Sequence, residues 1–346
     1  LEGQVSILSS GLLDSQEALD LLHRLGNSPL YRADQHSYIL YPDRDLPGFL
    51  QKNSIAPSRV AGIGLVAALA AANDRTLLMR DENGIYHFNG AFRNARDVAA
   101  ALQRLRQTEE LAQLVDADTK MILDLFEETF DHRSFTGRSG TFFAFEGLGS
   151  IYWHMVTKLL LAVQENYWWA RNSHADAATL KGLAVAYYDV RAGIGFNKTP
   201  SVYGAFPTDP YSHTPKGQGA KQPGMTGQVK EEILTRLGEL GVRIDAGGLV
   251  FDPALLRSQE FAAAPSVFEV VGLDGQRRTL PVPANALAFT LCQTPVVLVR
   301  AGRAHIEVVY ADGQVAQISG SRLEPALAQH LLRRDGEIAL LVVSIA

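Results

Sequence analysis

The pattern of hydrophobic residues changes near Gly241, and this change limits the folds that are open to the chain. Before it, apolar residues recur at helical spacing in segments such as 15–26 and 149–172. After it, short β-rich runs alternate with Asp-Gly, Gly-Gly and Pro turns. The first pattern is typical of amphipathic helices and the second of antiparallel strands. The sequence therefore predicts a mainly α-helical domain over residues 1–240 and an all-β, sandwich-like domain over residues 241–346.

The composition is that of an ordinary soluble globular protein. The 346 residues are 47% hydrophobic and 20% charged, with a net charge of −5, so a basic face for nucleic acid is not expected. Cys292 is the only cysteine, which excludes an intramolecular disulfide and favours a reducing cytoplasm. The most apolar run, 60–73, is too short and too rich in Ala and Gly for a membrane span. We expect neither nucleic acid nor membrane as a partner.

The first residue is Leu1, and the chain enters helical sequence within a few residues. This beginning is typical of the interior of a protein, and we expect the chain to be part of a longer polypeptide; a processed or trimmed N-terminus is the alternative. The remainder of that polypeptide, or a second copy in a homo-oligomer, is then the expected protein partner.

An irregular, proline-rich loop over 203–222 comes directly before the predicted helix "MTGQVKEEILTR". Long ordered loops are usually functional. Thr226 can cap the helix, and Gly227 allows a ligand to approach the backbone closely. The free N–H groups of a helix start favour an anion. The pattern predicts an anion site here, although an ordinary capped helix would have the same sequence.

His154 belongs to a polar stripe on the otherwise apolar segment 149–172. Ser150, His154 and Lys158 are spaced by four residues, so they share one helix face. Polar groups on a buried helix must face partners, water or a ligand. His154 is therefore a candidate ligand-binding residue, and a structural histidine is the alternative.

Two carboxylates are candidates for general acid or base. Glu146 lies in "GRSGTFFAFEGLGS", among phenylalanines and glycines, where apolar surroundings would raise the pKa of its carboxyl group. Asp209 in "FPTDPY" has a similar setting. Either carboxylate could instead bond to nearby backbone. The sequence offers no metal-ligand cluster, phosphate-binding P-loop or serine nucleophile elbow.

Aromatic residues are concentrated between positions 152 and 211. Sugar rings stack on such side chains, but helix packing also uses them frequently. The candidates for contact with a sugar are Trp153, Tyr203, Tyr211 and the loop residue His213.

The order of these motifs resembles the C-terminal half of the cellobiose phosphorylase-like enzymes, glycoside hydrolase family 94. The resemblance is carried by "GLGSIYWHM", "TDPYSHTPKGQGA", "MTGQVKEEILTR" and "GLVFDP", in this order, over residues 147–346. It implies an (α/α)6 toroid flanked by β-sandwich domains. It also implies that phosphate attacks the anomeric carbon of a β-glucoside, with inversion. No cofactor is implied, and inorganic phosphate is the co-substrate.

By this resemblance, His154, Thr226, Gly227 and the adjacent Gln228 would hold phosphate, and the partner would be an oligosaccharide or a sugar phosphate. The chain departs from the family in two places. The Asp-Trp-Asn-Asp motif that carries the catalytic aspartate is absent, and "QVKEE" replaces the Gly-Trp-Met that commonly follows Thr-Gly. The acid therefore lies outside this chain, or another residue such as Glu146 serves, or the site is inactive.

Two alternatives to a phosphorylase follow from the same residues. An inverting glycoside hydrolase would use two carboxylates and water in place of phosphate. A non-catalytic carbohydrate-binding or scaffold module would bind sugar through aromatic residues without a titrating acid. Phosphate-dependent cleavage of a β-glucoside would distinguish the phosphorylase from both.

Overall fold

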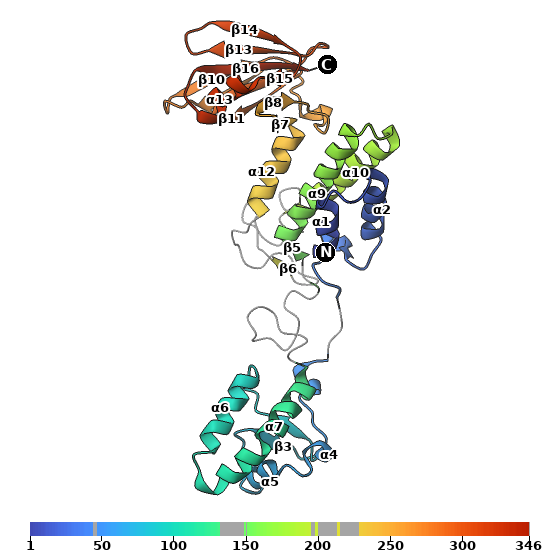
Figure 1. Ribbon diagram of the computed structural model, residues 1–346, viewed down its shortest axis with the longest axis vertical. Coiled ribbons are helices and arrows are strands. Elements are labelled where there is room, and N and C mark those ends of the chain that lie inside the picture. The colour runs from blue at the N-terminus through green and yellow to red at the C-terminus, as the bar shows by residue number, and fades with distance from the viewer. Residues whose placement is uncertain are drawn as a thin grey trace. The chain divides into compact units, whose positions relative to one another are not determined.

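The computed structural model describes residues 1–43, 47–131, 149, 151–194, 198–199, 213–214 and 228–345 (Figure 1). The chain divides into two compact units that interleave along the sequence. The first unit comprises Leu1–Gln4, Leu21–Val156 and Ala192–Thr226, and the second comprises Val5–Asp20, Thr157–Arg191 and Gly227–Ala346.

The described residues before position 240 are mainly helical, as the sequence predicts. The helices are α1 (Glu2–Ser9), α2 (Ser15–Gly26), α3 (Phe49–Lys52), α4 (Pro57–Val60), α5 (Gly64–Ala71), α6 (Ala95–Leu105), α7 (Glu109–Phe130), α9 (Trp153–Asn172), α10 (Ala177–Ala192) and α12 (Gln228–Glu239). Three two-stranded sheets accompany them: β1 (Tyr31–Arg32) with β2 (Ser37–Tyr38), β3 (Leu78–Arg80) with β4 (Tyr86–Phe88), and β5 (Ile151–Tyr152) with β6 (His213–Thr214).

Residues 55–130 form a hydrophobic core of their own, from α4 to α7 and the β3–β4 hairpin. Phe126 is fully buried between Phe88 and Phe130, with ring centroids 5.1 Å and 4.8 Å away. The hairpin turns at Gly84, whose φ of +84° requires a residue without a side chain. The sequence predicts this hairpin from its Asn-Gly turn.

Helix α9 is buried on most of its circumference, as its composition predicts. From Trp153 to Ala170, the positions that are not buried are His154, Lys158, Leu161, Glu165 and Trp169, and the helix then ends in two exposed residues, Arg171 and Asn172. The spacing of the first five, three or four residues, places them on one face. The predicted stripe that includes His154 and Lys158 is therefore the one accessible face along this helix.

In the second unit, α9 packs against α1, and α10 packs against α2. The buried amide of Asn166 donates to the carbonyl oxygen of Leu8 at 2.9 Å. Gly182 in α10 lies so close to Leu19 of α2 that a Cβ at this glycine would be 2.6 Å from a leucine methyl. The glycine therefore lets these two helices approach closely.

The residues after 241 form mostly antiparallel strands. The principal sheet has five strands in the order β11 (Ala286–Leu291), β12 (Thr294–Arg300), β16 (Ile338–Ile345), β13 (His305–Tyr310) and β14 (Val315–Ser319). A three-stranded sheet has the order β15 (Arg322–Leu323), β8 (Gly248–Phe251) and β7 (Val242–Asp245), and β9 (Ser266–Val271) pairs with β10 (Arg277–Val282). Helix α13 (Pro325–Arg333) precedes β16.

One pairing differs from the all-antiparallel arrangement that the sequence predicts. Strand β16 lies between β12 and β13, parallel to the first and antiparallel to the second. The apolar side chains of the inner strand β12 point alternately to the two faces of the sheet. Val296 and Leu298 join the larger core with α13 and β8, whereas Val297 packs with Val282 of the hairpin β9–β10. Both faces of the sheet are thus covered, and the sequence runs there are apolar rather than alternating.

Candidate functional site

The start of α9 brings together the main chains of three predicted site residues. Strand β5 leads directly into α9, and its Tyr152 pairs with His213 of β6. Trp153 and His154 are the first residues of the helix. The His154 ring meets the Tyr152 ring edge-on at 5.8 Å, and its Nδ1 lies 3.4 Å from the Tyr152 hydroxyl oxygen. The structure thus places His154 beside one end of the β5–β6 pair.

Trp153 is 2% exposed, and one face of its ring contacts the Lys198 ammonium group. The Lys198 nitrogen lies 4.3 Å from the ring centroid, within the range of a cation–π interaction, and donates to Gln35 Oε1 at 3.1 Å. The pKa of Lys198 is lowered to about 7, mainly by burial and also by the nearby Arg32, against the opposing effect of Asp34. This amine can therefore gain or lose a proton near neutral pH.

Arg32 and Asp34 form a bidentate ion pair next to this lysine. The guanidinium Nε and Nη2 each lie 2.8 Å from a carboxylate oxygen. The hydrogen bond from Arg32 lowers the pKa of Asp34, so the pair remains charged. Two cations and one carboxylate leave a net positive charge beside Trp153 whenever Lys198 is protonated, and this favours an anion.

Sequence reasoning missed Arg32, Asp34, Gln35 and Lys198. The first three lie in a short, irregular segment, "YRADQH", that has no periodicity to mark it. Lys198 is 163 positions from Gln35, its hydrogen-bond partner. The Arg-x-Asp spacing within a turn was the one local signal of an ion pair.

Six of the predicted site residues lie outside the described part of the chain: Glu146, Tyr203, Asp209, Tyr211, Thr226 and Gly227. Gln228 is the first residue of α12, so a helix does follow Thr226 and Gly227 directly, as predicted. Gln228 belongs to the second unit and His154 to the first. The roles of these residues in phosphate or sugar binding remain predictions.

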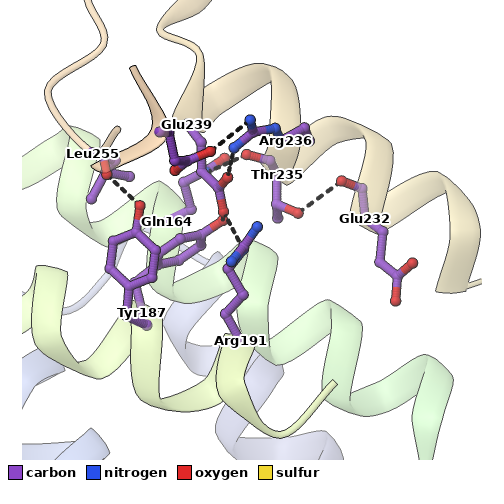
Figure 2. A network of polar contacts seen from close by, with 10 residues as sticks. Gln164, Tyr187, Arg191, Glu232, Thr235, Arg236, Glu239 and Leu255 are labelled. Atoms are coloured by element: carbon purple, nitrogen blue, oxygen red, sulfur yellow. Dashed lines mark hydrogen bonds and ion pairs between the residues drawn. The ribbon is translucent and has the colours of Figure 1, made fainter. Parts of the chain in front are cut away.

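A second polar cluster surrounds the carboxylate of Glu239 near the end of α12 (Figure 2). This side chain is 1% exposed and accepts a hydrogen bond from the Tyr187 hydroxyl at 2.6 Å. Arg191 of α10 lies 2.6 Å from one carboxylate oxygen, and Arg236 lies 2.5 Å from the other. Arg236 also pairs with Glu260 at 2.7 Å. A buried carboxylate is tolerated here because cationic and hydroxyl donors surround it.

Neighbouring groups connect α12 to α9 as well (Figure 2). The Gln164 amide donates to the Thr235 carbonyl oxygen at 2.8 Å, and the Thr235 hydroxyl donates to the Glu232 carbonyl oxygen at 3.0 Å. Burial raises the pKa of the Tyr187 hydroxyl, and the nearby Glu239 charge raises it to a smaller extent. Burial also raises the pKa of the Glu232 carboxyl group, although the Arg191 charge lowers it. The network fixes the C-terminal half of α12, at Thr235 and Glu239, against α9 and α10.

The part of the chain that the structure describes contains no group of three or more His, Cys, Asp or Glu side chains arranged to hold a metal ion. A search of the same residues finds no helix that is both long and apolar enough to span a membrane.

Residues 46–133 match the family model of the GH149 phosphorylase insertion domain 2. This stretch includes the segment 55–130 that has a separate core. A comparison with curated proteins gives no significant match. The family match supports a relationship with glycoside phosphorylases, as the motif order predicts, but it does not point specifically to the cellobiose phosphorylases of family 94.

Proposed function

We propose that the chain is part of a phosphorylase that cleaves β-glucosides with inorganic phosphate. The match of residues 46–133 to a phosphorylase insertion domain is the observation that carries this proposal. The motif order over residues 147–346, which comes from a different part of the chain, supports the same class of reaction.

In the proposed reaction, an oxygen of phosphate donates an electron pair to the anomeric carbon of the sugar. The bond from that carbon to the glycosidic oxygen breaks, and its electron pair stays on the leaving oxygen. A carboxylic acid gives its proton to that oxygen, so the products are a sugar 1-phosphate of inverted configuration and a shortened saccharide. Glu146 and Asp209 are the candidates within this chain for the acid, and a residue outside the chain is the alternative.

His154, Thr226, Gly227 and Gln228 are the proposed phosphate-binding residues. Three observations support them. His154 lies on the accessible face of α9, the positive cluster of Arg32 and Lys198 adjoins its neighbour Trp153, and α12 begins at Gln228. Free N–H groups at a helix start and a histidine donor are both suited to an anion.

We further propose that Trp153, Tyr203, Tyr211 and His213 contact the sugar. Residues 1–240 would then belong to an (α/α)6 toroid, and residues 241–346 to a β-sandwich-like domain. The support is the predominance of helices before position 240 and of antiparallel strands after it.

The test is phosphate-dependent cleavage by the protein that contains this chain. Incubation of β-linked gluco-oligosaccharides with phosphate should release glucose 1-phosphate, and omission of phosphate should stop the reaction. Release of free glucose without phosphate would instead identify a hydrolase, and saccharide binding without cleavage would identify a non-catalytic module.

The phosphate-binding role of His154 has a separate measurement. His154→Ala should raise the KM for phosphate about tenfold or more, which corresponds to the loss of one charge-assisted hydrogen bond. His23→Ala, at an exposed position of α2, is the matched control and should leave the KM for phosphate unchanged. An unchanged KM in His154→Ala would remove this residue from the phosphate site.

A further inference from the structure

Strand β14 forms one outer edge of the five-stranded sheet (Figure 1). Its residues, Val315–Ser319, pair with β13 on one side. On the other side, no strand pairs with it in the part of the chain that the structure describes. The strand lies between Gly313 and Gly320, whose φ angles of +86° and +89° turn the chain at each end. The open edge is therefore confined to the short segment between these glycines.

The hydrogen bonds to β13 determine which backbone groups of β14 point outward. At one end of the strand, the Tyr310 N–H donates to the Gln314 carbonyl oxygen at 2.9 Å, and at the other end the Gly320 N–H donates to the Ala304 carbonyl oxygen at 3.0 Å. Bonded and non-bonded pairs alternate along an antiparallel ladder. The non-bonded positions of β14 are therefore every second residue: Val315, Gln317 and Ser319. Their N–H and C=O groups point away from β13, toward the open edge.

Edge strands of natural proteins are usually protected by charged side chains, proline or a covering segment. The other edge strands of the β region follow this rule through Arg243 and Asp245 in β7, Glu269 in β9, Pro281 in β10, Arg322 in β15 and a bridge from Ala262 to β11. Strand β14, with the sequence "VAQIS", has no charge and no proline. Among the edges that the structure describes in the β region, this one lacks such protection and can accept another strand.

The sequence of β14 is complementary to itself about Gln317. When two copies lie antiparallel with Gln317 opposite the partner's Gln317, Val315 lies opposite the partner's Ser319. Each of these pairs exchanges two backbone hydrogen bonds, because all its members present outward groups. On the other face, the same register places Ala316 opposite the partner's Ile318, and both residues pack at the margin of the core. Apolar side chains then meet on the core face, and no like charges meet on either face.

The side chain of Gln317 suits a position on a twofold axis. Its Nε2 donates to Glu307 Oε1 at 3.0 Å, which leaves the second amide hydrogen and the carbonyl oxygen for another partner. A carboxamide contains both donors and an acceptor, so two copies of it can bond to each other. A charged residue at this position would face its own copy, and like charges directly opposite each other are destabilising.

We propose that two copies of this chain associate through β14, antiparallel and in register about Gln317, so that their five-stranded sheets join into one. The interface is isologous, because both copies use the same surface. A single pair of short strands buries little area, so the association is weak and reversible. The inference does not rest on the proposed phosphorylase activity, because β14 contains none of the residues proposed for phosphate or sugar binding.

Sedimentation velocity of the protein that contains this chain tests the proposal, at concentrations from about 1 to about 100 μM, where small interfaces form and dissociate. The weight-average mass of the parent should rise with concentration toward twice that of the variant Gln317→Pro. Proline removes the outward N–H at the axis but breaks no backbone bond to β13, and edge strands tolerate it at such positions. The variant should therefore melt close to the parent in dilute solution and keep the lower mass at every concentration.

Thr279→Pro is the matched control. Thr279 is exposed and occupies a non-bonded position of β10, opposite Glu269, so this variant should associate as the parent does. Hydrogen exchange in segment 314–320 of the parent should also become slower as the concentration rises.

Equal masses of the parent and Gln317→Pro at the highest concentration would overturn the proposal, whether both proteins are monomers or both are oligomers. A monomeric parent with slow exchange in segment 314–320 at every concentration would overturn it as well, because another part of the polypeptide would then cover the edge. Both outcomes are independent of whether phosphate-dependent cleavage occurs.

Discussion

Replacement of Glu239 by alanine should strongly destabilise the second unit. The change removes the partner of the Tyr187 hydroxyl and of two guanidinium groups, those of Arg191 and Arg236. Removal of one partner of a buried ion pair costs about 3–5 kcal/mol of unfolding free energy. Arg236 is 38% exposed and retains Glu260, so water and the second carboxylate reduce its share. We therefore expect a loss of about 3 kcal/mol, near the lower limit for a buried pair.

Urea denaturation measures this loss, with far-UV circular dichroism and tryptophan fluorescence as signals. All three tryptophans of the chain lie in α9, which contacts α12 through Gln164. Tyr187→Phe should lose about 1.5 kcal/mol, the value of one hydrogen bond to a charged group. Glu324→Ala is the matched control, because this glutamate is 66% exposed, and should change stability by no more than about 0.5 kcal/mol. A Glu239→Ala variant as stable as this control would refute the account of the network.

Three further changes test other contacts. Burial lowers the pKa of Lys198 to about 7 from an ordinary 10.5. Between these pH values the unfolded chain therefore holds more protons on this amine than the folded chain does. The melting temperature of the parent should then rise with pH relative to that of Lys198→Met. A difference in melting temperature between the two proteins that stays constant over this pH range would contradict the expectation. Asp118→Ala removes the carboxylate that accepts a hydrogen bond from the Leu65 N–H at 2.7 Å. The loss should lower the free energy of unfolding by about 1–2 kcal/mol and speed hydrogen exchange in α5. Unchanged exchange in α5 would argue against a capping role for Asp118. Gly238→Ala should lower the melting temperature despite a gain of about 1 kcal/mol in helix propensity, because its Cβ would lie 2.1 Å from the Gln164 side-chain oxygen; a higher melting temperature would show that α9 can move away.

The elements that the sequence predicts well are those whose pattern is local. The hairpin β3–β4 follows from an Asn-Gly turn between apolar runs, and its turn glycine has the positive φ that such a turn requires. Helix α9 follows from an apolar run with a polar stripe, and His154 lies on the accessible face. Such features need no knowledge of the rest of the chain.

The features that the sequence does not predict depend on partners that are distant along the chain. Glu239 reads as a polar residue on an amphipathic helix, and only its packing against α10 reveals a buried ion pair. The contact of Lys198 with Trp153 joins two segments that no periodicity relates. For the candidate site, the sequence indicates the helix start at Gln228 and the position of His154, but not the positive cluster that Arg32 and Lys198 form.

The position of β16 has a consequence for synthesis. Residues 338–345 leave the ribosome after every other strand of the five-stranded sheet, yet they occupy its centre, between β12 and β13. Until then, the facing edges of those two strands have no partner, and unpaired edges are sites of aggregation. The hairpins β11–β12 and β13–β14 can therefore join into one sheet only after β16 has left the ribosome.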